Sequence, residues 1–109
     1  MITVRFFKKG SIFTGFEVEG HAFFDDEGRD IVCAAVSSAV YMTANTVTDV
    51  LCEKCECIEK EGYIKLSLCE DASQSALDFL RGLELHLRCL AEDYPENLKV
   101  IYHGGVKNA

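Results

Sequence analysis

Residues 2–19 read ITVRFFKKGSIFTGFEVE, and this stretch decides the fold. Polar and apolar residues alternate over residues 2–7, and a second β-forming run covers residues 11–19. A period of two is typical of a strand with one buried face. The break between the two runs, Lys8-Lys9-Gly10, has the composition of a turn. The chain is therefore predicted to open with a β-hairpin.

A helix is predicted after this hairpin. Residues 31–50 keep one apolar stripe at helical spacing, and Asp30 stands just before it, where N-cap residues are favoured. The stripe consists of Val32, Ala35, Val36, Ala39, Val40 and Thr43. Residues 20–29, GHAFFDDEGR, lie between the hairpin and the helix and have the glycine and acidic content of a loop.

The second half of the chain repeats this order. Its elements are a hairpin over residues 52–59 and 63–69, closed by Glu61-Gly62, a helix over residues 73–93 that Pro95 stops, and a short strand over residues 98–102. The order β-β-α-β-β-α-β predicts an α+β sandwich with both helices packed on one face of a sheet. The pattern leaves the strand order open. We expect a single domain over residues 1–109, with residues 103–109 as a loose tail.

Composition and charge exclude several classes of function. The chain has 109 residues, of which 49% are hydrophobic and 27% charged, and this is ordinary globular composition. Its net charge of −7 repels a phosphate backbone, so we expect no direct nucleic-acid partner. No apolar run approaches the roughly 18 residues that predict a membrane span, and the N-terminus carries no secretory pattern. We therefore expect a cytoplasmic protein without a membrane partner.

Six cysteines raise the questions of disulfides and of metal binding. They are Cys33, Cys52, Cys55, Cys57, Cys69 and Cys89. Without a secretory signal, free thiols are expected. Cys52, Cys55 and Cys57, joined by Cys69, are similar to a zinc ligand set. However, Cys55 and Cys57 alternate along a predicted strand and the usual ligand-bearing turn is missing, so we expect no metal and no other cofactor.

Cys33 and His21 are the candidate catalytic residues. If Asp30 is the N-cap, Cys33 lies in the first helical turn, where free N–H groups and the helix dipole stabilise a thiolate. His21 follows the second predicted strand and would fold back toward the helix start as the base. Ser37 lies one turn after Cys33 on the same face and would hold the nucleophile or the substrate. Asp30 is given an orienting role only, because its charge would raise the pKa of a nearby thiol.

Both candidate residues also have ordinary explanations. A cysteine at the start of an apolar helix is usually a small buried hydrophobic residue, and a single histidine near a glycine is usually a surface residue. Two further functions stay open on the residues alone. One is a non-catalytic interaction module, and the other is a small-molecule thiol hydrolase or acyltransferase with a closed apolar pocket.

A series of motifs resembles one known family. The motifs extend along nearly the whole chain. They are GHA at residues 20–22, an acidic loop, DIVCAAVS at residues 30–37, a Glu-Gly-Tyr hairpin and a helix that ends at Tyr94-Pro95. Together they resemble the ribosomal-processing cysteine protease family called Prp. The resemblance implies a Cys/His protease that is a homodimer. Its substrate would be a precursor of large-subunit ribosomal protein twenty-seven, from which it removes a short N-terminal extension by cutting after a pair of phenylalanines.

The resemblance also assigns roles by position. It makes Cys33 the nucleophile and His21 the catalytic histidine, with Asp30 and Ser37 as flanking polar positions. The loop before Cys33 is then expected to gate the site. Its contributing residues are Gly20, Phe23, Phe24, Asp25, Asp26, Glu27 and Gly28. The glycines would serve as hinges, the phenylalanines would line an apolar subsite, and the acids would attract a basic ribosomal protein. CEKCEC at residues 52–57 departs from the family pattern.

Overall fold

The computed structural model describes residues 1–20 and 27–105 and confirms the predicted order of elements. The strands are β1 (Ile2–Lys9), β2 (Ile12–Glu19), β3 (Cys55–Lys60), β4 (Tyr63–Leu68) and β5 (Leu98–Gly105). The helices are α1 (Glu27–Asn45), which continues into the π-helical turn η1 (Thr46–Val50), and α2 (Gln74–Asp93). Ser73 caps α2, because its side chain accepts a hydrogen bond from the N–H of Ala76.

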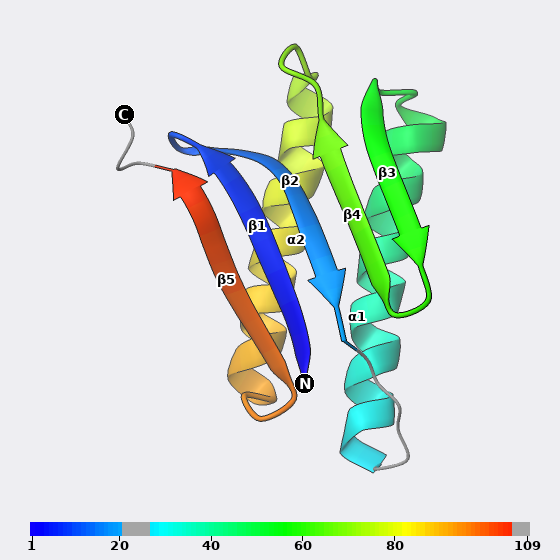
Figure 1. Cartoon of the computed structure of the whole chain (residues 1–109), viewed down its shortest axis with the longest axis vertical. Helices are drawn as coiled ribbons and strands as arrows, with labels where there is room; N and C mark the ends of the chain where they lie inside the picture. Colours follow the sequence, from blue (N-terminus) through cyan, green and yellow to red (C-terminus); the bar gives the residue numbers. More distant parts are fainter. Residues whose placement is uncertain (21–26, 106–109) are drawn as a thin grey trace.

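The five strands form one sheet in the order β3-β4-β2-β1-β5. β1 and β5 are parallel, and all other neighbouring pairs are antiparallel. Both helices lie on the same face of the sheet, as predicted (Figure 1). The sequence pattern left the strand order open because two hairpins can join along either edge. The structure joins them through β2 and β4, so the middle of the sheet is built from both halves of the chain.

The core fills the space between the sheet and the two helices. Alternate residues of the three central strands are buried, and they are Val4, Phe6, Phe16, Val18, Ile64 and Leu66. The buried helix residues that face them are Val32, Val36 and Val40 of α1 and Ala76, Leu80, Leu83 and Leu87 of α2. The predicted helical stripe of α1 is therefore confirmed, and burial of these residues provides the main favourable free energy of folding.

Helix α1 differs from the prediction at both ends. It begins at Glu27, so Asp30 lies within the first turn and is not the N-cap. The residues from Glu27 to Asp30 were expected in the loop or at the cap, but an acidic residue is also favoured inside a first turn, so the pattern does not separate the two positions. At the other end the α-helix stops at Asn45, and the N–H of Leu51 bonds the carbonyl oxygen of Thr46 at 2.8 Å in the π-helical turn.

Strand β5 extends past its predicted end. Residues 103–105, expected to belong to a loose tail, pair with β1, and His103 lies opposite Phe7. The two rings meet edge to face with centroids 5.8 Å apart. This segment pairs with β1 at the other end of the sequence, so no local pattern predicts the pairing. Residues 106–109 are outside the described residues.

The expectation that no stretch could cross a membrane needs one correction. By length and composition alone, residues 31–50 form a helix long and apolar enough to do so. In the fold, however, Val32, Val36, Val40 and Val47 of this segment are buried in the core. A single buried stripe is the pattern of a core helix.

A buried carboxylate joins α2 to β5. Glu84 is only 8% exposed and accepts hydrogen bonds from Arg88 Nε at 2.9 Å and from the Tyr102 hydroxyl. Burial opposes ionisation of Glu84, but the two hydrogen bonds and the charge of Arg88 outweigh it and lower the pKa of Glu84. Burial and the bond to Glu84 raise the pKa of Tyr102 to about 12. The hydroxyl of Tyr102 therefore stays a donor, and the bond holds the edge strand to the helix.

Two glycines give opposite predictions for stability. A Cβ at Gly15 in β2 would lie 2.4 Å from the carbonyl oxygen of Leu66, whereas a Cβ at Gly82 in α2 would meet nothing within 4 Å. We predict that Gly15→Ala lowers the free energy of unfolding by about 1–3 kcal/mol through overpacking. Gly82→Ala should raise it by roughly 0.5–1 kcal/mol, because alanine is the better helix former. Urea unfolding of both variants tests this, and an unchanged midpoint for Gly15→Ala would contradict the packing.

Candidate active site

Cys33 lies in a cavity at the end of the sheet where β2 stops and the β3–β4 hairpin turns. The cavity has a volume of about 210 Å³, and it lies between α1 and the sheet. It is lined by Val18, Gly20, Cys33, Val36, Ser37, Val40, Tyr41, Gly62, Tyr63 and Ile64. Cys33 is half-buried, so its thiol has access to both the apolar interior and the solvent.

The α1 wall of the cavity carries a polar row. Cys33, Ser37 and Tyr41 are spaced four residues apart, which places them on one face of the helix at successive turns. Val36 and Val40, on the adjacent row, supply apolar surface beside them. The structure thus brings Cys33 and Ser37 together, as their spacing predicted. Tyr41 extends the same row by one turn and was not among the predicted site residues.

The sheet wall depends on a glycine. Gly20 has a φ of +87°, and a Cβ there would lie 2.5 Å from the carbonyl oxygen of Met1. Its N–H donates to the carbonyl oxygen of Gly62 at 3.2 Å, which ties the end of β2 to the tip of the β3–β4 hairpin. Gly20 is followed directly by His21. Gly20 is therefore a fixed point on the wall opposite Cys33, and the candidate catalytic histidine is the next residue in the sequence.

Several predicted site residues lie outside the described residues, so their roles remain predictions. These are His21, Phe23, Phe24, Asp25 and Asp26. Asp30, Glu27 and Gly28 lie in the first turn of α1, and Gly20 lines the cavity.

One argument for the reactivity of Cys33 is wrong, namely its place in the first helical turn. Because α1 starts at Glu27, Cys33 lies in the second turn, so the free N–H groups of the helix start are not at its own position.

A hydrogen-bonded network braces the sheet wall from its other face. The Tyr63 hydroxyl donates to Glu17 Oε2 at 2.5 Å, and Arg5 Nη1 contacts Glu17 Oε1 at 3.1 Å and Glu19 Oε1 at 2.5 Å. The bond from Tyr63 is the first cause that lowers the pKa of Glu17, and the bond and charge of Arg5 add to it against the cost of burial. Strands β1, β2 and β4 are thus cross-linked beside the cavity.

Tyr41 and Tyr63 are the aromatic residues of the cavity lining that sequence reasoning missed. Helical spacing from Cys33 was the available signal for Tyr41. No comparable signal exists for Tyr63, because it depends on the register that pairs it with Glu19 of β2. Long-range register is not encoded in a local pattern.

None of the four cysteines Cys52, Cys55, Cys57 and Cys69 lines this cavity. Burial raises the pKa of the Cys55 thiol, with further contributions from the neighbouring Cys57 and Cys69, and burial also raises the pKa of Cys57. A raised pKa leaves less thiolate at neutral pH, so these thiols are poor nucleophiles. Within residues 1–20 and 31–104, no group of three histidine, cysteine, aspartate or glutamate side chains has the geometry to hold a metal ion.

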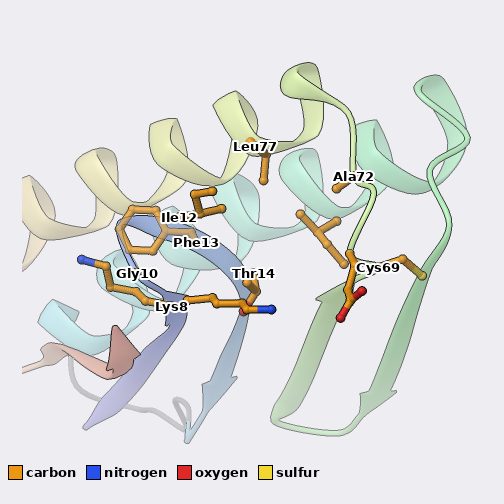
Figure 2. A pocket seen from close by; sticks show the side chains of 11 residues that line it. Lys8, Gly10, Ile12, Phe13, Thr14, Cys69, Ala72 and Leu77 are labelled. Carbon is orange, nitrogen blue, oxygen red and sulfur yellow. The ribbon is translucent and has the colours of Figure 1, made fainter. Parts of the chain in front are cut away.

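A larger hollow of about 790 Å³ lies at the opposite end of the sheet (Figure 2). Its wall combines Ile12 and Phe13 of β2 with Leu77 of α2, and Lys8 places its ammonium group 5.2 Å from the centroid of the Phe13 ring. Cys69 also lines it, but none of the predicted catalytic residues does. The thiol of Cys33 therefore selects the smaller cavity as the candidate active site.

Comparison with known proteins identifies the family. The model of the family described as cysteine protease Prp matches residues 1–99. The ribosomal processing cysteine protease Prp of Bacillus subtilis is 33% identical over 93 residues, which cover 78% of this chain and 81% of that protein. The chain belongs to the Prp family of cysteine proteases.

Solved structures support the Prp fold over almost the whole chain. The Prp of Staphylococcus aureus in complex with a substrate peptide has a TM-score of 0.84 at 23% identity and covers 94% of this chain and 100% of its own. The same protease with a covalently linked product peptide has a TM-score of 0.82 at 24% identity and equal coverage. The SMU.848 protein of Streptococcus mutans has a TM-score of 0.82 at 26% identity and covers 95% of each chain.

Membership of the Prp family makes this chain a cysteine protease of the ribosomal-processing kind. It is therefore an enzyme and not the non-catalytic module considered above. The cavity agrees with this activity, because a half-buried thiol lines it. The predicted resemblance to Prp is confirmed.

Gly20 provides a test of the sheet wall of the Prp cavity. We predict that Gly20→Ala lowers peptide-cleaving activity at least several-fold, because the new methyl group must displace Met1 or the end of β2. Gly10→Ala is the matched control, since Gly10 also has a positive φ of +64° but a Cβ there meets nothing within 4 Å. That variant should lose about 1–2 kcal/mol of stability from the left-handed backbone and keep its activity. Equal activities of the two variants would contradict the assignment of this wall.

Proposed function

We propose that this protein is a cysteine endopeptidase that removes the short N-terminal extension of large-subunit ribosomal protein twenty-seven. The observation that carries the proposal is the position of Cys33 in an open cavity whose opposite wall ends at Gly20, the residue before His21. Relatives that bear the name ribosomal processing cysteine protease support the substrate class. The covalently linked product peptide in the Staphylococcus aureus Prp supports covalent catalysis by a thiol.

The proposed reaction has two chemical steps. The Cys33 thiolate attacks the carbonyl carbon of the scissile peptide, and His21, which holds the thiol proton as an imidazolium, gives that proton to the leaving amine. A thioester between Cys33 and the extension remains. Neutral His21 then removes a proton from a water molecule, the hydroxide attacks the thioester, and the thiolate leaves as the acid product forms. Ser37 and Asp30 would hold the nucleophile and orient the histidine.

The segment before Cys33 would control access to the cavity. In this proposal Gly20 and Gly28 act as hinges, and Phe23 and Phe24 line a subsite for apolar side chains. The acidic residues Asp25, Asp26 and Glu27 add to a protein whose net charge is already −7. Such a surface attracts a lysine-rich ribosomal protein and repels nucleic acid, so selection would begin before the peptide reaches the thiol.

The protein is also proposed to be a cytoplasmic homodimer. An apolar groove of about 720 Å³ between α1 and α2 supports self-association, and it includes the exposed side chains Met42 and Phe79. Exposed apolar surface of this kind is typical of an interface. Sedimentation equilibrium should give twice the chain mass, and Met42→Asp should shift the protein toward the monomer. A monomer at every concentration would contradict this.

The nucleophile assignment has a direct test. We predict that Cys33→Ala abolishes cleavage of an N-terminally extended ribosomal protein twenty-seven, followed by mass spectrometry, while the unfolding midpoint changes little because alanine suits a helix. His21→Ala should lower kcat by about 10²–10⁴-fold. Cys89→Ala is the matched control, since this exposed thiol of α2 lies outside the cavity.

Two outcomes would argue against the proposal. Full activity of Cys33→Ala would exclude Cys33 as the nucleophile. Rapid turnover of a small thioester without any cleavage of the extended protein would instead favour the small-molecule hydrolase. The unchanged Cys89→Ala variant excludes a general effect of removing a thiol.

A further inference from the structure

Tyr41 links the helix that carries Cys33 to an edge strand. Its hydroxyl donates a hydrogen bond to Glu59 Oε2 at 2.5 Å, and Glu59 belongs to β3. Within residues 1–20 and 31–104, this is the only side-chain hydrogen bond that joins α1 to a strand. All other described attachment of α1 to the sheet is apolar packing, through residues such as Val32 and Val36.

The two kinds of contact constrain the helix differently. Burial of the row Val32, Val36 and Val40 sets which face of α1 meets the sheet, but single apolar contacts are non-directional, so they define the rotation of the helix less sharply than a hydrogen bond does. A hydrogen bond has a preferred direction and length, so the Tyr41 bond restricts the remaining rotation. Tyr41 lies on the same helical face as Cys33, two turns away, and both line the cavity. A rotation of α1 that broke the Tyr41 bond would therefore also turn Cys33.

The strand end of this bond lies next to the other wall of the cavity, on the neighbouring strand β3. Glu59 is paired with Ile64 of β4, and Ile64 lines the cavity together with Gly62 and Tyr63. The Tyr41–Glu59 hydrogen bond thus joins α1, which carries Cys33, to the β3–β4 hairpin, whose residues Gly62, Tyr63 and Ile64 line the cavity opposite. The bond to Glu59 raises the pKa of Tyr41, so the tyrosine remains a donor at neutral pH.

We propose that Tyr41 and Glu59 are positioning residues for the protease reaction. They hold the thiol-bearing face of α1 at one angle and distance from the β3–β4 hairpin, so the carbonyl carbon of the bound peptide meets Cys33 in line for attack. The proposal rests on the proposed role of Cys33 as the nucleophile. A misplaced reactive atom lowers the rate of the chemical step. A hydrogen bond between the partly exposed side chains of Tyr41 and Glu59 contributes little to the stability of the whole fold.

The test uses two tyrosines that make the same kind of bond. Tyr41→Phe removes only the hydroxyl at the cavity. Tyr102→Phe removes a hydroxyl that bonds Glu84 between β5 and α2, and neither of those residues lines the cavity. For cleavage of the extended ribosomal peptide, we expect kcat to fall by about 5–20-fold in Tyr41→Phe, with a smaller change in KM, and to stay within about twofold in Tyr102→Phe.

Variants of the acceptor separate positioning from a direct role of Tyr41. Glu59→Gln keeps a carbonyl oxygen that accepts the Tyr41 hydrogen bond, so it should retain most of the wild-type kcat. Glu59→Ala should behave like Tyr41→Phe, and the double variant should be no slower than either single variant, since both remove one bond. Urea unfolding accompanies each assay, and Glu59→Ala keeps the test valid if Tyr41→Phe fails to fold.

The inference is overturned if Tyr41→Phe and Tyr102→Phe have equal kcat values, or if Glu59→Ala is as active as the wild type. Cys33→Ala, assayed in the same way, separates this result from the proposed function. An active Cys33→Ala removes the nucleophile assignment and the positioning role with it. An inactive Cys33→Ala together with a fully active Tyr41→Phe removes the positioning role alone.

Discussion

One-sided burial of the sheet is the constraint on which the rest of this structure depends. Both helices cover one face, so each central strand has an inner and an outer row of side chains (Figure 1). On β2 the inner row contains Phe16 and Val18, the outer row contains Glu17, and Gly20 follows directly after the strand. The inner row ends at Val18, and Gly20, which lines the cavity beyond the strand end, has no side chain. Space is therefore left between α1 and the sheet, and Cys33 faces this space.

Much of this arrangement follows from local patterns. Alternation over residues 2–19 and the helical stripe from Val32 onward predict the strands, the helices and the side of each that is buried, because hydrophobic burial imposes those two periods. The order of elements then predicts the layers. The strand order and the extension of β5 through residues 103–105 do not follow, because pairing between distant segments has no period of its own.

The candidate site is predictable to a lesser degree. Cys33 and Ser37 come from motif and spacing, and both line the cavity. The reason first given for a reactive Cys33, a place in the first helical turn, is incorrect because α1 starts at Glu27. Helix ends depend on a few capping contacts that compete on nearly equal terms, whereas a stripe sums burial over many residues. Tyr63 enters the site only through the pairing of β2 with β4.

The packing of α1 against the core determines where the Cys33 thiol lies. Val32, Val36 and Val40 form the buried row of α1, and the row that begins at Cys33 is the same row moved on by one residue. One residue corresponds to a turn of about 100° around the helix, which carries a side chain from the core to the edge of the interface. The valines thus set the axis of α1 and the face that it turns to the sheet, and the Cys33 row follows from that orientation. A catalytic group in this position needs no rigid loop of its own, because close packing of the interior already limits its movement.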